Sequence, residues 1–220
     1  MVGETLPDSA PATTLFPQFE SQIHTMYSTE VGGLSDPELD FVSDRWEWSR
    51  WSIRRTVSHI SSGDIRWLVL RWEDQLFSPG DPEVADFKGV LAPDGNPWLD
   101  PERYWEIGAV LQHFKKTLGL CQRLLSRETV GSLRSKEIRQ PFTDQSKLFS
   151  QAHPDGYRQD PKDPSHCFIS LLATFRHRYF EYTTHMFNIH RLKKAQGLAT
   201  RVEVPYEGYW ALPGWDRSEP

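Results

Sequence analysis

The sequence predicts an all-α fold, a four-helix bundle with long interhelix loops, and three observations favour it. Apolar residues recur at helical spacing in four separate segments of the 220-residue chain. Stretches rich in proline, glycine and aspartate separate these segments. No alternation of strand-like and helical segments predicts a parallel sheet. Four long helices joined by long crossovers are typical of a four-helix bundle.

The first two predicted helices have recognisable ends. The first covers residues 14–29, and two consecutive glycines follow it at positions 32 and 33. The second covers residues 52–75 and begins at Ser52, whose hydroxyl suits an N-cap. Pro79, Gly80 and Pro82 close this second segment.

The third and fourth predicted helices both begin at an Asp-Pro pair. Asp100-Pro101-Glu102 places a capping acid, a first-turn proline and an early carboxylate in the favoured order, and apolar spacing continues to Leu125. The fourth helix is predicted over residues 163–196, with Gly197 after its last turn. Its apolar residues lie on more than one face, so we expect several neighbours around it.

The remaining segments are predicted to be loops and an irregular aromatic C-terminal tail. Two long loops cover residues 77–99 and 129–163, and residues 133–142 within the second could hold a short strand or turn. The tail after Gly197 contains PYEGYWALPGW and is expected to pack on the surface of the bundle. We therefore predict a single domain over residues 1–220, with its core over about 14–197.

Composition excludes several classes of protein. The 25 Lys and Arg residues are outnumbered by 30 Asp and Glu residues, which argues against binding to nucleic acid. No apolar run reaches the ~20 residues that span a membrane, and the N-terminus lacks the apolar stretch of a signal peptide. Two cysteines cannot form a disulfide framework. Phosphate-binding glycine loops and the serine-hydrolase GxSxG motif are also missing. We expect a cytoplasmic protein that binds a small molecule, with no nucleic-acid or membrane partner.

A row of polar residues on the fourth predicted helix is the strongest candidate for chemistry. His177, Glu181 and His185 follow one another at four-residue intervals and share one sector of the helix, among apolar neighbours. Polar groups in such a place need partners, and a divalent cation could satisfy two imidazoles and a carboxylate. His177 and His185 are two turns, about 12 Å, apart, so Glu181 would share an ion with either one. The alternative is that these three residues are ordinary hydrogen-bonded side chains that bind no metal.

A third ligand would have to come from another helix. His24, His59 and His113 lie on the first, second and third predicted helices. The spacing of residues along the chain does not distinguish among these three histidines.

The run Trp51-Ser52 with His59 eight positions after the Trp resembles the start of the second helix in the DinB/YfiT-like family of metalloenzymes. In that family a Trp-Ser pair opens the helix that carries the first metal-binding histidine. The last helix of the family carries His-x-x-x-His, with Gln three residues later and a Leu-Gly helix end about a dozen residues later.

The resemblance extends to the last helix of this chain. His185 matches the second histidine of the pair, Asn188 takes the Gln position and Gly197 falls at the helix end. Glu181 stands where most members carry the first histidine, although related mycothiol-linked members carry Glu-x-x-x-His there. The resemblance thus implies a metal site of His59, Glu181 and His185. His177 is an additional candidate, either as a substitute ligand or as a hydrogen-bond partner of a ligand.

The resemblance implies a divalent-metal-dependent enzyme of the DinB-like superfamily. Two imidazoles and one carboxylate suit zinc, nickel, iron or manganese, and three protein ligands leave a position open for catalysis. The expected activity is a transferase reaction with a low-molecular-weight thiol cosubstrate, or a metal-assisted hydrolysis. The alternative is a metal-free helical-bundle protein that has lost catalysis and acts in binding or in dimerisation, as a homodimer. Its nine tryptophans would then line a pocket or an interface.

Overall fold

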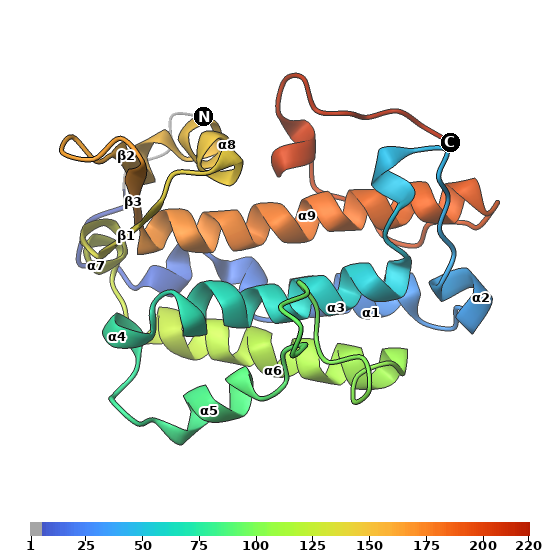
Figure 1. The fold of residues 1–220 in the computed structure, drawn as a ribbon, viewed down its shortest axis with the longest axis horizontal. Coiled ribbons are helices and arrows are strands. Elements are labelled where there is room, and N and C mark those ends of the chain that lie inside the picture. Colours follow the sequence, from blue (N-terminus) through green and yellow to red (C-terminus); the bar gives the residue numbers. More distant parts are fainter. Residues whose placement is uncertain (1–5) are drawn as a thin grey trace.

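The computed structural model describes residues 6–220 and shows a mostly helical chain with one small sheet (Figure 1). The helices and strands of the described residues are α1 (Gln22–Val31), α2 (Asp36–Leu39), α3 (Ile53–Asp64), α4 (Glu73–Leu76), α5 (Pro82–Lys88), α6 (Ile107–Ser126), α7 (Val130–Ser135), β1 (Glu137–Pro141), α8 (Asp144–Ala152), β2 (Tyr157–Gln159), β3 (His166–Ser170) and α9 (Leu171–Ala195). A π-helical segment (Ile65–Leu70) continues α3, and short 3-10 turns occupy Ala12–Thr14, Pro17–Phe19, Glu47–Ser49, Pro154–Gly156 and Tyr209–Ala211.

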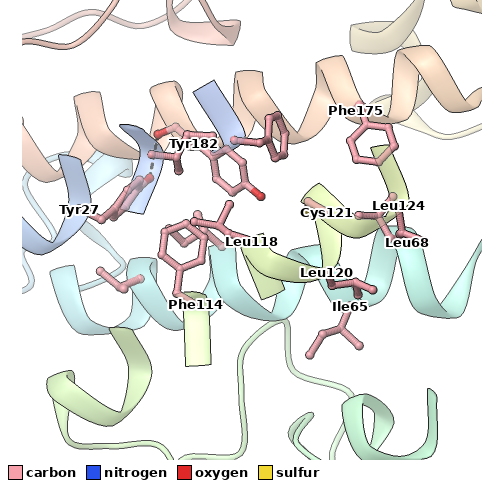
Figure 2. Close-up of a cluster of buried hydrophobic side chains, with 14 of the residues drawn as sticks. Tyr27, Ile65, Leu68, Phe114, Leu118, Leu120, Cys121, Leu124, Phe175 and Tyr182 are labelled. Atoms are coloured by element: carbon pink, nitrogen blue, oxygen red, sulfur yellow. Dashed lines mark hydrogen bonds between the residues drawn. The ribbon is translucent and has the colours of Figure 1, made fainter. Parts of the chain in front are cut away.

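Four helices, α1, α3, α6 and α9, run alongside one another and enclose the main core (Figure 1). At the centre of this core the rings of Tyr27, Phe114 and Tyr182 meet edge to face (Figure 2). The Tyr27 hydroxyl donates a 2.7 Å hydrogen bond to the backbone carbonyl of Tyr182, which joins α1 to α9. These fully buried aromatic contacts fix the position of α9, the helix that carries the polar row.

The first two predicted helices exist, with different bounds. The first begins only at Gln22, because Pro17 opens a separate 3-10 turn before it. The second begins as predicted, since the Ser52 hydroxyl accepts a 3.2 Å hydrogen bond from the backbone N–H of Arg55. It does not continue unbroken to residue 75, because the helix widens to the π form after Asp64 and ends at Leu70.

Both Asp-Pro starts were wrong as helix starts. Asp100 forms a turn, in which its carboxylate accepts from the backbone N–H of Glu102 at 3.0 Å, and α6 begins seven residues later, at Ile107. The segment after Asp163 forms strand β3, and α9 begins at Leu171 with Ser170 as the N-cap. The predicted end is confirmed, since Gly197 follows α9 with a φ of 73°.

The three-stranded sheet is the part of the fold that the all-α prediction lacks. Its order is β1-β3-β2, and both pairs are antiparallel. Strand β1 lies within residues 133–142, where a short strand or turn was expected. Cys167 and Ile169 of β3 alternate with less buried neighbours, so one face is buried. The sheet, α7 and α8 lie at the end of the helical core where α9 begins (Figure 1).

A buried ion pair joins the helices close to the polar row. Asp64 of α3 and Arg178 of α9 are almost fully buried, with the Asp64 carboxylate 2.9 Å from Nε of Arg178. The Thr117 hydroxyl of α6 donates to the same carboxylate at 2.7 Å, and the Tyr182 hydroxyl also donates to it. Arg178 in turn donates to the carbonyl of Ile60 at 3.0 Å. This network sets the register of α3 against α9.

The aromatic tail packs on α9, and the sequence predicted that it packs on the surface of the bundle. Tyr209 and Trp210 are buried, and the Trp210 ring stacks on Phe187 with centroids 4.5 Å apart. Gly208, at a φ of 137°, lies so close to Thr183 that a Cβ atom would be 2.3 Å from its hydroxyl. A glycine is therefore required where the tail crosses the helix.

A second buried carboxylate, Glu30 of α1, holds the end of α9. Its oxygens accept from the Lys193 ammonium at 2.6 Å and from the backbone N–H groups of Arg201 and Val202 at 2.8 and 2.9 Å. Burial acts to raise the pKa of Glu30, but contacts with His190, Lys193 and the Arg201 backbone outweigh it and lower the pKa to about 2. The carboxylate is thus ionised in the folded protein at any pH above this value.

Glu30→Gln is expected to make the free energy of unfolding depend less on pH in the acid range. Because the folded pKa lies below the unfolded one, the stabilisation from Glu30 is complete above the unfolded value and is lost as the pH falls towards about 2. Between these two pKa values, ionisation of Glu30 makes the free energy of unfolding of the parent protein change by up to about 1.4 kcal/mol per pH unit. The variant should lack this contribution. Urea unfolding of both proteins between about pH 5.5 and about pH 3.5 measures the difference. Parallel profiles would show that Glu30 does not contribute.

Candidate metal centre

The structure brings together His59, Glu181 and His185. Each offers one ligand atom, and these atoms all lie within 4.8 Å of one another. Oε2 of Glu181 is 3.3 Å from Nε2 of His185 and 3.6 Å from Nε2 of His59. Ligands of a tetrahedral ion with bonds of about 2.1 Å are separated by about 3.4 Å. The donor atoms are nitrogen and oxygen, so both their type and their spacing from Glu181 fit a divalent metal ion.

Two helices supply the three side chains. Glu181 and His185 are four residues apart on α9 and therefore share a face of that helix. His59 lies on α3, which packs against α9. The buried pair of Asp64 and Arg178 joins the same two helices within about one turn of the cluster. The cluster therefore depends on tertiary packing as well as on helical spacing.

A backbone carbonyl orients His59. Nδ1 of His59 lies 2.7 Å from the carbonyl oxygen of Pro97, in the loop between α5 and α6. Since a carbonyl only accepts, Nδ1 carries a proton. In the neutral ring, Nε2, which lies on the side of Glu181, would then hold the lone pair that a metal ion needs. The Ser62 hydroxyl donates to the same carbonyl at 2.7 Å. Such a hydrogen bond to the far nitrogen is usual for histidines that bind metal.

The protonation states in the cluster are set by burial and by mutual contact. The three side chains are between 15% and 19% exposed. Burial acts to raise the pKa of Glu181, but its contacts with the rings of His185 and His59 outweigh burial and hold the pKa well below its ordinary value. Burial lowers the pKa of His185. An ionised carboxylate and a neutral imidazole are the forms that bind metal ions.

Trp51 covers the cluster on its outer side. Its ring is 4.9 Å from that of His59 and lies parallel to that of His185, at 6.3 Å and 4°. A hollow of about 390 Å³ opens beside it, lined by Trp48, Trp51 and His185 among others. Trp51 is 36% exposed, so the cluster is shielded from bulk water and remains reachable from one side.

The other histidines that the sequence offered lie outside the cluster. His177 is buried against the rings of Trp67 and Phe149, and its Nδ1 pairs with the Tyr209 hydroxyl at 2.7 Å. His24 contacts the Leu111 carbonyl, and His113 pairs with the Ser61 hydroxyl. The spacing along α9 allowed His177 and Glu181 to share a metal ion. In the structure His177 is not part of the cluster, because aromatic residues enclose its ring.

Sequence reasoning missed two groups that shape the site. The carbonyl of Pro97 is a backbone atom in a long loop, so no side-chain pattern could indicate it. Trp98, in the same loop, packs edge to face on Trp51 at 5.9 Å. Its position after a proline did not indicate this contact, because contacts between distant segments produce no regular spacing of residues in the sequence.

The chain matches no protein-family model, no curated protein and no solved structure. Within residues 6–220, no helix combines the length and the apolar character needed to cross a membrane.

Proposed function

We propose that this chain is a divalent-metal-dependent enzyme of the DinB-like type, with His59, Glu181 and His185 as the three protein ligands. The observation that carries the proposal is the convergence of their ligand atoms within 4.8 Å, from helices more than 100 residues apart in sequence. Their donor set suits zinc, nickel, iron or manganese. The packing of α1, α3, α6 and α9 around one core supports the assignment to a DinB-like four-helix bundle.

The arrangement supports catalysis rather than a structural metal site. Three protein ligands leave at least one coordination position for a water molecule or substrate, and the hollow beside His185 gives access to it. A metal ion there would lower the pKa of a bound water or thiol and so supply a nucleophile near neutral pH. Glu181 and His185 would hold the ion, Pro97 would keep His59 in its binding tautomer, and Trp51 would limit entry of water. We propose thiol-dependent transfer as the reaction, with metal-assisted hydrolysis as the alternative.

One further feature favours a metal-free alternative. Glu181 lies within 3.3 Å of His185, so the side chains can satisfy one another by hydrogen bonding without an ion. The protein would then be a helical binding module. Metal analysis separates the two functions.

Removal of metal is expected to lower the melting temperature. The purified protein should contain about one divalent ion per chain, and a free metal concentration of about 100 Kd stabilises a folded protein by about 2.7 kcal/mol. For a domain of this size that corresponds to a fall of about 5–10 °C on treatment with EDTA. Elemental analysis and thermal unfolding, with zinc, nickel, iron or manganese added back, measure both effects. A protein that binds none of these ions and melts at the same temperature with EDTA would contradict the proposal.

A further inference from the structure

A second hollow also borders Trp51. It has a volume of about 440 Å³, and its lining includes Arg50, Trp51, Arg55, Trp98 and Trp105. Trp51 and Arg50 also line the hollow that reaches His185. Both hollows therefore adjoin the tryptophan that packs on the histidine cluster.

Arg55 is the unusual residue of this second hollow. Its guanidinium carbon lies 4.6 Å from the ring centroid of Trp98 and 5.0 Å from that of Trp105. Within residues 6–220 no carboxylate forms an ion pair with Arg55, and its side chain donates no hydrogen bond. A guanidinium has five N–H donors and stays charged, so a half-buried one without an acceptor is poised to bind an anion.

The aromatic walls around Arg55 are fixed to α3. Trp98 lies between Pro97, whose carbonyl accepts from His59, and Leu99, whose N–H donates to the Ser58 hydroxyl at 3.0 Å. On the other side, the Arg54 guanidinium donates to the carbonyl of Trp105 at 2.8 Å. These bonds hold both rings in place before any ligand arrives, which lowers the entropy lost on binding.

The charges in the hollow favour an anion. Asp40, which also lines it, is already paired with the buried Arg54 at 2.7 Å. Arg50 adds a second guanidinium, whose charge is partly offset by the exposed Glu47 at 2.8 Å. No carboxylate that lines the hollow is therefore paired with Arg55.

Arg55 also lies at a useful distance from the cluster. It precedes His59 by four residues on α3, so the two side chains share a face about 6 Å apart along the axis. Trp51 contacts His59 and lines the hollow that contains Arg55. A small molecule held at Arg55 could thus reach the cluster with its other end.

We propose that Arg55 binds the carboxylate of the substrate or cosubstrate used at the metal centre, and that the tryptophan walls hold its apolar part. This inference rests on the proposed function and adds the class of ligand to it. The ligand is a small carboxylate with an apolar body, whose reactive group lies about one helical turn from the carboxylate.

The first test uses a carboxylate probe that cannot bind the metal through sulfur. The EDTA-treated protein is titrated calorimetrically with 3-phenylpropionate and with the neutral 3-phenylpropanamide. The two probes have nearly the same shape, so a difference in affinity reports the effect of the negative charge. We expect the carboxylate to bind at least about tenfold more tightly, as for other hydrogen bonds between charged groups. Arg55→Met should remove this preference. Equal affinities for the two probes, or a preference that survives in Arg55→Met, would overturn the proposal.

Arg45→Met is the matched control. Arg45 also stacks on a tryptophan, at 4.6 Å from the ring of Trp46, but it does not line the hollow. This variant should keep the full preference for the carboxylate. A loss equal to that of Arg55→Met would show that general surface charge, rather than the hollow, attracts the probe.

The second test connects the hollow to the metal centre. With metal-loaded protein, 3-mercaptopropionate should bind more tightly than 2-mercaptoethanol, and Arg55→Met should remove the difference while its metal content stays unchanged. A difference that persists in Arg55→Met would overturn the link between the hollow and the centre. If the protein binds no metal, the proposed function fails, while the titration with 3-phenylpropionate still decides whether Arg55 binds carboxylates.

Discussion

His185→Ala is expected to reduce the affinity for a divalent metal ion by more than about a hundredfold. Loss of a hydrogen-bond partner behind a ligand already costs about 10–100-fold in metal affinity, and this substitution removes a ligand itself. His185 provides one of the three atoms that converge on the centre. Competition titration with a chelator of known affinity measures the change, and elemental analysis of the purified variant gives its metal content.

His177→Phe is the matched control for this variant. His177 lies on the same helix two turns earlier, and phenylalanine would keep its packing against Trp67 and Phe149. Its metal affinity should remain within about threefold of the parent protein, because His177 is outside the cluster. If His177→Phe lost metal and His185→Ala kept it, the assignment of ligands along α9 would have to be reversed.

Arg178→Met is expected to destabilise the protein by about 3–5 kcal/mol, because it leaves a buried charge without its partner. The Asp64 carboxylate is fully buried and pairs with Nε of Arg178 at 2.9 Å. Among residues 6–220, the hydroxyls of Thr117 and Tyr182 would remain as its donors. The free energy of unfolding is measured by urea titration, as a fall in the midpoint concentration at constant slope.

Two further variants make the origin of this loss clear. Arg139→Met removes a partly exposed arginine that pairs with Asp160 and Asp163, and it should cost about 1 kcal/mol or less. The double variant Asp64→Leu with Arg178→Met removes both buried charges and should recover part of the stability. A loss below about 1 kcal/mol in Arg178→Met would mean that the pair is not needed to hold α3 against α9.

Local chemistry allowed part of the fold to be predicted. The cap at Ser52 and the helix end at Gly197 are confirmed, because each depends on residues within one turn. Asp100 and Asp163 misled the prediction, since an aspartate followed by proline also suits a turn. The sheet was missed because its strands are only three to five residues long, which leaves little periodicity to detect.

The candidate site was predicted only in part by spacing. Helical periodicity placed Glu181 and His185 on one face, but it could not select His59 over His24 or His113. That choice came from the resemblance to the DinB/YfiT-like family, and the structure places the chosen histidine beside the other two residues. Membership of the family itself stays a prediction. Tertiary neighbours are set by how helices cross, which sequence spacing does not encode.

The carbonyl of Pro97 has a consequence for any mutational survey of this protein. It accepts from both His59 and Ser62, and it belongs to the main chain. Every side-chain substitution at position 97 keeps that oxygen, so an alanine scan of the loop would report the position as neutral wherever the path of the chain is retained. Shortening or lengthening the loop would move the oxygen and release the imidazole. In this protein, the length of a connecting segment therefore helps to set the orientation of His59 in the cluster.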